Sequence, residues 1–236
     1  MDRQKQTSVR ELFDLMKTLE ELADFYATDK RKSDHNYIQF YQKYFDPIKD
    51  TIKNILEIGI LDHPDKIRRP YTGASLLMWQ DYFPNAKIYG VDIQDFKKMN
   101  NERITTLIAD QSNRVHLSST MKNVLEPLNI IIDDGGHMMH QQQISFAFLF
   151  PILKSGGWYI IEDLHTSHLE PPFAPGSSQL TPDDTLTQDM LHDFIKTKKI
   201  VSIFMKPEEI KYLEENILDC IIEKGTMSEI AFIIKK

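Results

Sequence analysis

The sequence has almost no cysteine: Cys220 is the only one among 236 residues. A single thiol cannot build a disulfide framework or supply the ligands of a structural zinc site. Neither is needed, because a chain of this length buries roughly 70 to 75% of the surface that its unfolded form exposes. With 41% hydrophobic and 27% charged residues, the composition is that of a globular protein and excludes a disordered or low-complexity chain.

The sequence also lacks an excess of positive charge and any long apolar run. Lysine and arginine number 28 against 35 acidic residues, and the bases do not cluster beyond short groups at 30–32 and 68–69. We therefore expect no nucleic-acid partner and no binding to anionic lipid. The N-terminal stretch has no apolar core of a secretory signal, and no apolar run approaches 18 residues. The sequence predicts a cytoplasmic protein without a membrane partner and leaves homo-oligomerisation open.

Short apolar runs alternate with amphipathic stretches along the chain. Five runs are typical of strands buried on both faces of a parallel sheet, at residues 52–60, 86–93, 103–110, 128–134 and 156–163. Helical spacing predicts helices at 8–26 with Ser8 as N-cap, at 75–83 with Ser75 as cap, at 138–153 and at 186–197, with a crossover at 111–125. Two further β runs, 218–225 and 228–236, read as a hairpin.

This order of elements predicts an α/β sandwich of the Rossmann-like kind. Its sheet should be seven-stranded and mostly parallel, with an antiparallel C-terminal hairpin. We expect residues 1–50 to form an N-terminal helical segment or cap, and residues 51–236 to form the main domain. The proline-containing stretch 165–184 is the longest loop-like segment, and loops of this length are often lids.

Acidic residues follow each of the five predicted parallel strands. Ligands of such sheets bind outside the carboxyl ends of the strands, so these acids should meet at one rim. Asp92, after the second strand, could accept both hydroxyls of a ribose, and Asp110, after the third, could accept an exocyclic amine. Taken singly, either could instead be a turn or cap residue.

The motifs LEIGI, YGVDI, IADQS and IIIDDGGH, in this order, resemble those of class I S-adenosylmethionine-dependent methyltransferases. Two longer segments, YATDKRKSDHNYIQFYQKYF and IIDDGGHMMHQQQISFAFLFPILKSGGWYIIEDLHTSH, are similar to segments of the metal-dependent sugar O-methyltransferases of macrolide and tetracenomycin biosynthesis, in the cephalosporin hydroxylase-like group. The likeness implies a class I methyltransferase fold, S-adenosylmethionine and Mg²⁺ or another divalent cation as cofactors, and a sugar or glycosylated small molecule as acceptor.

The resemblance also implies roles for single residues. Asp134, Glu162 and Asp163 match the three carboxylates of the family's cation site, and His137 matches its proposed general base. The cofactor-binding residues expected on the same grounds are Glu57, Gly59, Ser75, Asp92, Asp110, Gln111 and Asp133. A place over the cofactor or acceptor is expected for the segment Thr28-Asp29-Lys30 and for His35 and Tyr37, without assigned roles.

The carboxylates and the histidine also have a chemical interpretation without the family. Hard cations prefer carboxylate oxygens, and three buried carboxylates without a cation would repel one another. Neighbouring hydroxyls of a sugar could chelate the cation, and His137 could then take a hydroxyl proton near neutral pH. The structural alternatives are a histidine packed in a turn and, for Glu162 and Asp163, a solvated pair that caps the next segment.

Glycine is scarce where many methyltransferases carry more of it. After Gly59 the next glycine is Gly73, and the residues 62–72, DHPDKIRRPYT, look inserted. A dinucleotide-binding fold is disfavoured as well, because no G-x-G-x-x-G follows the first strand.

Three other functions stay open at this point. The chain could methylate another acceptor class, such as a catechol-like phenol or a phosphate-linked group. It could be a non-catalytic module that binds the cofactor or a partner. A metal hydrolase is the third, because acidic strand ends also occur in phosphatases.

Overall fold

The computed structural model describes residues 18–124, 126–167 and 185–236. Ser8 and most of the predicted lid, residues 168–184, lie outside these ranges. Within them, no helix is long and apolar enough to cross a membrane.

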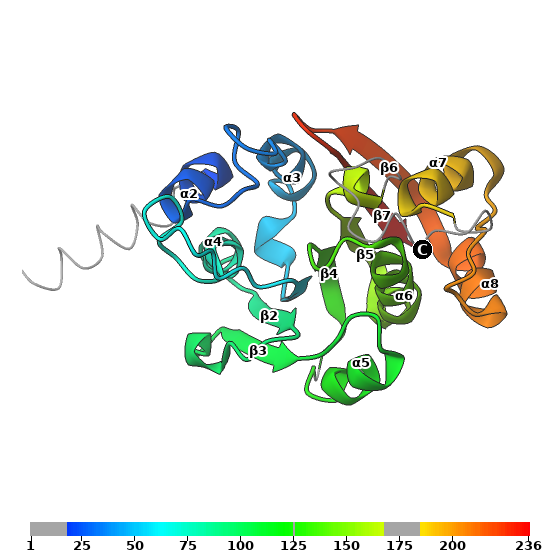
Figure 1. The fold of residues 1–236 in the computed structure, drawn as a ribbon, viewed down its shortest axis with the longest axis horizontal. Helices are drawn as coiled ribbons and strands as arrows, with labels where there is room; N and C mark the ends of the chain where they lie inside the picture. The colour runs from blue at the N-terminus through cyan, green and yellow to red at the C-terminus, as the bar shows by residue number, and fades with distance from the viewer. Residues whose placement is uncertain (1–17, 125, 168–184) are drawn as a thin grey trace, which may run out of the picture.

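A seven-stranded sheet forms the centre of the fold (Figure 1). The strand order is β3-β2-β1-β4-β5-β7-β6. The strands are β1 Asn54–Ile58, β2 Lys87–Asp92, β3 Ile104–Ile108, β4 Leu128–Asp133, β5 Leu153–Ile161, β6 Ile217–Lys224 and β7 Glu229–Lys235. The first five pair in parallel, and β7 lies antiparallel between β5 and β6. The predicted Rossmann-like sheet with a C-terminal antiparallel hairpin is confirmed.

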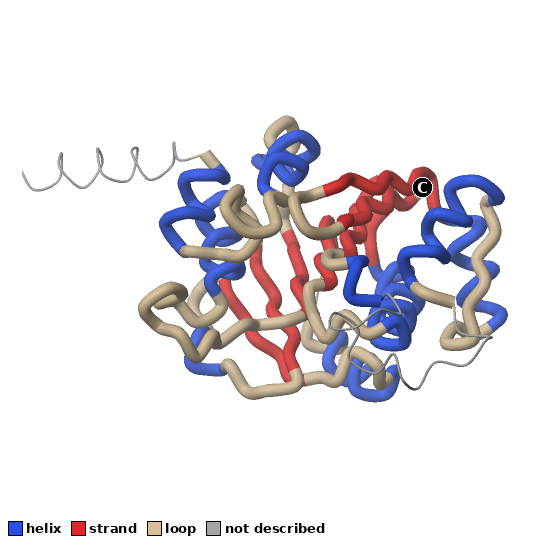
Figure 2. The backbone as a smooth tube through the Cα atoms, turned by 45° about the horizontal axis from the view of Figure 1, so that its top comes forward, coloured by secondary structure: helices blue, strands red, loops and turns tan. Residues whose placement is uncertain are grey.

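Helices cover both faces of this sheet (Figure 2). One face carries α2 Leu19–Tyr26, α3 Ile38–Phe45 and α4 Ala74–Tyr82. The other carries α5 Arg114–Met121, α6 Met139–Leu149, α7 Thr187–Thr197 and α8 Pro207–Asn216. Short 3-10 helices lie at Lys49–Thr51, Lys97–Met99, Phe150–Ile152 and Leu164–Ser167.

The two faces of the sheet support two apolar cores. β1 and β4 are buried along their whole length, which explains why both read as continuous apolar runs. On one face Tyr41 of α3 and Trp79 of α4 pack with a ring-centroid distance of 5.0 Å, and Tyr41 also contacts Phe232 of β7. The described part of the N-terminal segment therefore shares a core with the sheet.

The strand ends meet where the strand order reverses, between β1 and β4. The Gly59 N–H donates to the Val91 carbonyl at 2.8 Å, and the Asp134 N–H donates to the Ile58 carbonyl at 3.0 Å. The ends of β1, β2 and β4 are thus held together by backbone hydrogen bonds, at the place where ligands of open α/β sheets bind.

Two predictions about helices need correction. The helix predicted for 8–26 is interrupted at Thr18, which has extended backbone and caps α2 through a capping box with Glu21; the predicted start at Ser8 lies outside the described residues. Ser75 is not the cap of α4, because that helix begins one residue earlier, after Gly73 with φ of +57°. A Cβ on Gly73 would lie 2.3 Å from the Met99 side chain, so the chain needs glycine here.

The helix predicted for 138–153 ends at Leu149, and a 3-10 turn containing Pro151 leads into β5. Proline cannot continue an α-helix, which is why the strand starts at Leu153 and not at residue 156. Helix α8 was not predicted. Its signal was present in the sequence: Pro207 stands at the first helical position and Glu208 and Glu209 in the first turn.

Candidate active site

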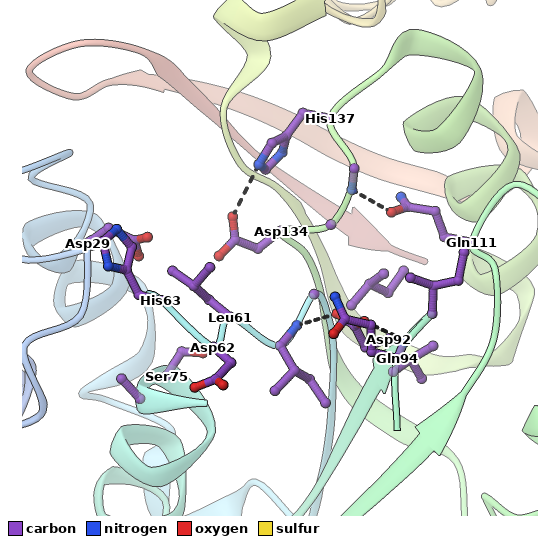
Figure 3. Close-up of a pocket in the computed structure, with 18 of the residues that line it drawn as sticks. Asp29, Leu61, Asp62, His63, Ser75, Asp92, Gln94, Gln111, Asp134 and His137 are labelled. Atoms are coloured by element: carbon purple, nitrogen blue, oxygen red, sulfur yellow. Dashed lines mark hydrogen bonds and ion pairs between the residues drawn. The ribbon is translucent and has the colours of Figure 1, made fainter. Parts of the chain in front are cut away.

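A cavity of about 500 Å³ opens at the carboxyl ends of the parallel strands. The predicted site residues that line it are Gly59, Ser75, Asp92, Asp110, Gln111, Asp134, His137 and Asp163. Figure 3 shows Asp134 and His137 on one side of the cavity and Asp92, Gln94 and Gln111 on another. The predicted Glu57, Asp133 and Glu162, all within the described residues, lie behind this lining.

Asp92 and Asp110 are held in place by hydrogen bonds from nearby loops. Asp92 accepts hydrogen bonds from the backbone N–H of Ile60 and of Gln94, both at 2.8 Å. Asp110 accepts from the backbone N–H and the hydroxyl of Ser112, and the hydroxyl bond is the main reason why the pKa of Asp110 is lowered. Both carboxylates are therefore fixed, and ionised at neutral pH in the case of Asp110, while still lining the cavity.

Gln111 joins the end of β3 to the loop after β4. Its side-chain nitrogen donates to Asp133 at 3.0 Å, and its oxygen accepts from the Gly136 N–H at 2.7 Å. Asp133 is fully buried, and it also accepts hydrogen bonds from Ser145 and Tyr159. Burial raises the pKa of Asp133 to about 6. The structure places Asp133 beneath the site, where it supports Gln111.

Gly59 allows a close approach of two backbones. Its φ is +97°, and a Cβ built there would lie 2.0 Å from the carbonyl oxygen of Asp134. A side chain would therefore push the β1 loop away from the loop that carries Asp134.

Asp134, His137 and Asp163 form a compact group of ligand atoms. One atom from each lies within 4.8 Å of the others. The His137 Nε2 atom is 4.0 Å from Asp134 Oδ1 and 3.7 Å from Asp163 Oδ2. Burial raises the pKa of Asp134, although the nearby Lys30 ammonium opposes this. Two carboxylates and an imidazole at this spacing are donors suited to a divalent cation.

The backbone is strained at two of these three residues. His137 and Asp163 have φ of +58° and +54°. Left-handed backbone is unfavourable for residues other than glycine, and such strain persists where the surrounding structure imposes it, often at functional sites. The strain therefore supports a functional role for both residues.

Glu162 and Glu57 surround a buried lysine that the sequence left without a role. The side chains of Lys30, Glu57 and Glu162 are almost fully buried. The Lys30 ammonium lies 3.0 Å from Glu162 and 3.4 Å from Glu57, and it also donates to Asp134. Burial raises the pKa of Glu57 to about 7, while burial and the repulsion of Asp134 raise that of Glu162 well above its usual range. Burial alone would lower the Lys30 pKa, but the three carboxylates together raise it.

Part of the cavity wall was not predicted. The segment from Leu61 to Tyr71 contributes to it, and Arg69 of this segment donates at 2.8 Å to the carboxylate of Asp29, which also lines the cavity and belongs to the stretch expected there. The residues that looked inserted after Gly59 therefore form part of the cavity wall. The irregular spacing was visible in the sequence, but the contact with Asp29 spans 40 residues and left no local signal.

This sheet order, with a cavity at the ends of β1 to β5, is that of a class I methyltransferase. The comparison with solved structures agrees: the chain is similar to MycE, a methyltransferase from the mycinamycin biosynthetic pathway, solved in complex with Mg, S-adenosylhomocysteine and mycinamycin VI. The identity is 28% and the TM-score 0.73, over 93% of this chain and 54% of MycE.

The sequence comparison leads to the same group. The chain is 37% identical over 134 residues to a rhamnosyl tetracenomycin-C 2′-O-methyltransferase of Streptomyces olivaceus, covering 57% of this chain and 34% of that protein. It is 37% identical over 169 residues to the demethylmacrocin O-methyltransferase of Streptomyces fradiae, covering 69% and 41%. No family model matches the chain.

The predicted resemblance is therefore confirmed: the homologues are sugar O-methyltransferases of natural-product pathways. The chain spans between 34% and 45% of the length of the curated relatives that it matches.

Proposed function

We propose that this chain is an S-adenosylmethionine-dependent, divalent-metal-assisted O-methyltransferase that acts on a hydroxyl of a sugar or glycosylated small molecule. The observation that carries the proposal is a single cavity whose wall holds both the carboxylates after β2 and β3 and the group Asp134, His137 and Asp163. A donor-binding half and a cation-binding half thus open into one space.

The half formed by β1 to β3 suits the methyl donor. The cavity volume lies within the range of roughly 300 to 1,000 Å³ that small-ligand sites occupy. We assign Asp92 to the ribose hydroxyls and Asp110 with Gln111 to the adenine. Gly59 and Ser75 also line the cavity, and we assign them to the methionine end. The negative charge of Asp92 and Asp110 also suits a sulfonium, which carries a positive charge.

The half formed by β4 and β5 suits a hard cation. Asp134 and Asp163 offer oxygen ligands into the cavity. Glu162 does not line the cavity, and its oxygens accept hydrogen bonds from Tyr41 and Lys30; we assign it as the third carboxylate of the cation site on the family resemblance. Burial is the main reason why the pKa of Asp134 is raised, and the repulsion of Asp29 and Asp163 adds to it. A cation beside these carboxylates would favour their ionised form. A divalent cation held here would act as a Lewis acid toward the acceptor hydroxyl.

We assign His137 as the general base. Its imidazole is partly exposed at 27% and faces the same space as both carboxylates. Mg²⁺ prefers oxygen ligands, which leaves the His137 Nε2 lone pair to accept the proton of the acceptor hydroxyl. The negative charge of Asp163 and Asp134 then stabilises the imidazolium that forms.

The proposal is tested by incubating the protein with S-adenosylmethionine labelled in its methyl group, Mg²⁺ and a panel of acceptors. The panel contains glycosides with vicinal sugar hydroxyls, catechols and phosphorylated sugars. Label should appear in the glycosides. Transfer to catechols alone would reassign the acceptor class, and binding of S-adenosylhomocysteine with no transfer to any acceptor would favour a non-catalytic module.

A further inference from the structure

The segment around helix α3 donates a buried hydrogen bond to each of three rim carboxylates. The donors are the Lys30 ammonium and the phenols of Tyr37 and Tyr41, and all three side chains have no exposed surface. Their acceptors are Asp134, Asp163 and Glu162, the carboxylates assigned above to the cation.

The hydrogen bonds select one oxygen of each aspartate. The Tyr37 hydroxyl donates to Asp163 Oδ1 at 2.6 Å, and it is Asp163 Oδ2 that faces His137. Lys30 donates to Asp134 Oδ2, and it is Asp134 Oδ1 that faces His137. In both cases the donor holds the inner oxygen and leaves the outer oxygen directed into the cavity.

Glu162 lies deeper than the two aspartates and links two of the donors. One of its oxygens accepts from the Tyr41 hydroxyl at 2.5 Å, and the other accepts from Lys30 at 3.0 Å. The backbone of the segment fixes the donors in turn, because the Lys30 carbonyl accepts from the N–H groups of Tyr37 and Ile38 at 2.9 and 3.1 Å. Tyr37 and Tyr41 are four residues apart at the start of α3, so their side chains lie on the same face of the helix.

We propose that Lys30, Tyr37 and Tyr41 are positioning residues that orient the carboxylates of the cation site. The inference rests on the cation site of the proposed function. Partners behind metal ligands orient them, and their removal typically weakens metal binding by 10- to 100-fold. His35, whose Nδ1 atom lies 3.2 Å from Asp163 Oδ1, borders the same oxygen from the solvent side.

The test compares Tyr37→Phe with Tyr44→Phe. Tyr44 also belongs to α3 and donates to a carboxylate, Glu223, at 2.6 Å, but Glu223 is on β6 and outside the cavity. Both variants remove one hydroxyl from the same helix and keep the ring. Mn²⁺ affinity is measured by electron paramagnetic resonance, S-adenosylhomocysteine affinity by calorimetry in EDTA, and folding by the urea midpoint.

Tyr37→Phe should weaken Mn²⁺ binding by at least 10-fold and leave S-adenosylhomocysteine affinity within about 2-fold of the wild type. Tyr44→Phe should change neither. Equal Mn²⁺ affinity of Tyr37→Phe, Tyr44→Phe and the wild type would overturn the positioning role but leave the proposed function standing. A wild-type protein that binds no Mn²⁺ at millimolar concentration would remove the cation site itself.

Discussion

At the scale of single residues, the site is an acidic rim in which each carboxylate has a different environment. Asp92 and Asp110 are fixed by backbone and hydroxyl donors at the edge of the cavity. Asp134 and Asp163 share their oxygens between buried donors and the cavity. Glu57 and Glu162 lie deeper, around the Lys30 ammonium. Carboxylates of one rim therefore have three different environments: the edge of the cavity, the group around His137, and the buried surroundings of Lys30.

Replacing His137 distinguishes its two possible roles, general base and cation ligand. His137→Ala should lower methyl transfer by about 100-fold or more, the usual contribution of a general base. Affinities for Mn²⁺ and S-adenosylhomocysteine should stay near those of the wild type, because the carboxylates and the donor half are intact. The measurements are initial rates and two binding titrations.

The matched control is His192→Ala, since His192 pairs with Glu229 on the far side of β7 and does not line the cavity. It should retain transfer. Full activity of His137→Ala would exclude the role as base, and a parallel loss of Mn²⁺ affinity would make His137 a ligand.

Glu57 should make the unliganded protein less stable as the pH rises. Burial raises its folded-state pKa from 4.5 to about 7, so between these values the folded state binds more protons than the unfolded state. The free energy of unfolding therefore falls as the pH rises through this window, by at most about 3 kcal/mol for this group. In EDTA and without cofactor, Glu57→Gln should show a smaller loss of stability between pH 5 and pH 8 in urea titrations.

Glu208→Gln, which removes an exposed carboxylate on α8, is the control and should follow the wild type. A Glu57→Gln protein with the pH dependence of the wild type would show that Glu57 titrates as it does in the unfolded chain.

The acids of the rim could be predicted from sequence because each one lies at or next to the end of a predicted strand. Their partners could not. Lys30 reaches Asp134 and Glu162 across 104 and 132 residues, and Tyr37 reaches Asp163 across 126. A lysine in a polar stretch gives no sign that it will be fully buried, since only the packed fold brings the carboxylates that make its burial tolerable.

Among the structural elements, the loops after β1 and β4 lie in close backbone contact, so a shift of one loop should displace the other. Gly59 is the contact point, and its backbone lies against that of Asp134. The strands that end in these loops were predictable from their apolar runs. The starts of α2 and α4 were not, because Thr18 and Gly73 compete with other plausible caps nearby and only tertiary contacts decide between them.

Gly59→Ala should therefore damage the site through the backbone. The left-handed φ costs about 1 to 3 kcal/mol for alanine, and overlap with the Asp134 carbonyl should add about 1 to 3 kcal/mol. Urea unfolding measures the loss of stability, and Mn²⁺ titration should show weaker binding because Asp134 must move.

Gly156→Ala provides the comparison, since Gly156 has φ of +72° but no atom within 4 Å of an added Cβ. Gly156→Ala should lose only the stability that the left-handed φ costs an alanine, and its Mn²⁺ affinity should be unchanged. Equal effects of the two substitutions on both measurements would contradict a close approach at Gly59.

At the scale of the whole molecule, the fold brings three distant parts of the chain to one rim. The sheet supplies the acidic strand ends, the segment 62–72 covers one wall of the cavity, and the segment around α3 packs behind the carboxylates. The sheet could be predicted, because the alternation of strands and helices restricts the topology strongly. The placement of the other two parts depends on side-chain packing, which has no periodic signal.

We expect methyl transfer by this protein to require a divalent cation at Asp134 and Asp163 beside the bound donor. The most direct measurement is the rate of transfer from S-adenosylmethionine to an accepted glycoside, with the protein first in EDTA and then with Mg²⁺ restored. If the cation is required, EDTA should abolish transfer and added Mg²⁺ should restore it. S-adenosylhomocysteine should still bind in EDTA, because the donor half of the cavity is intact. An unchanged rate in EDTA would contradict this requirement.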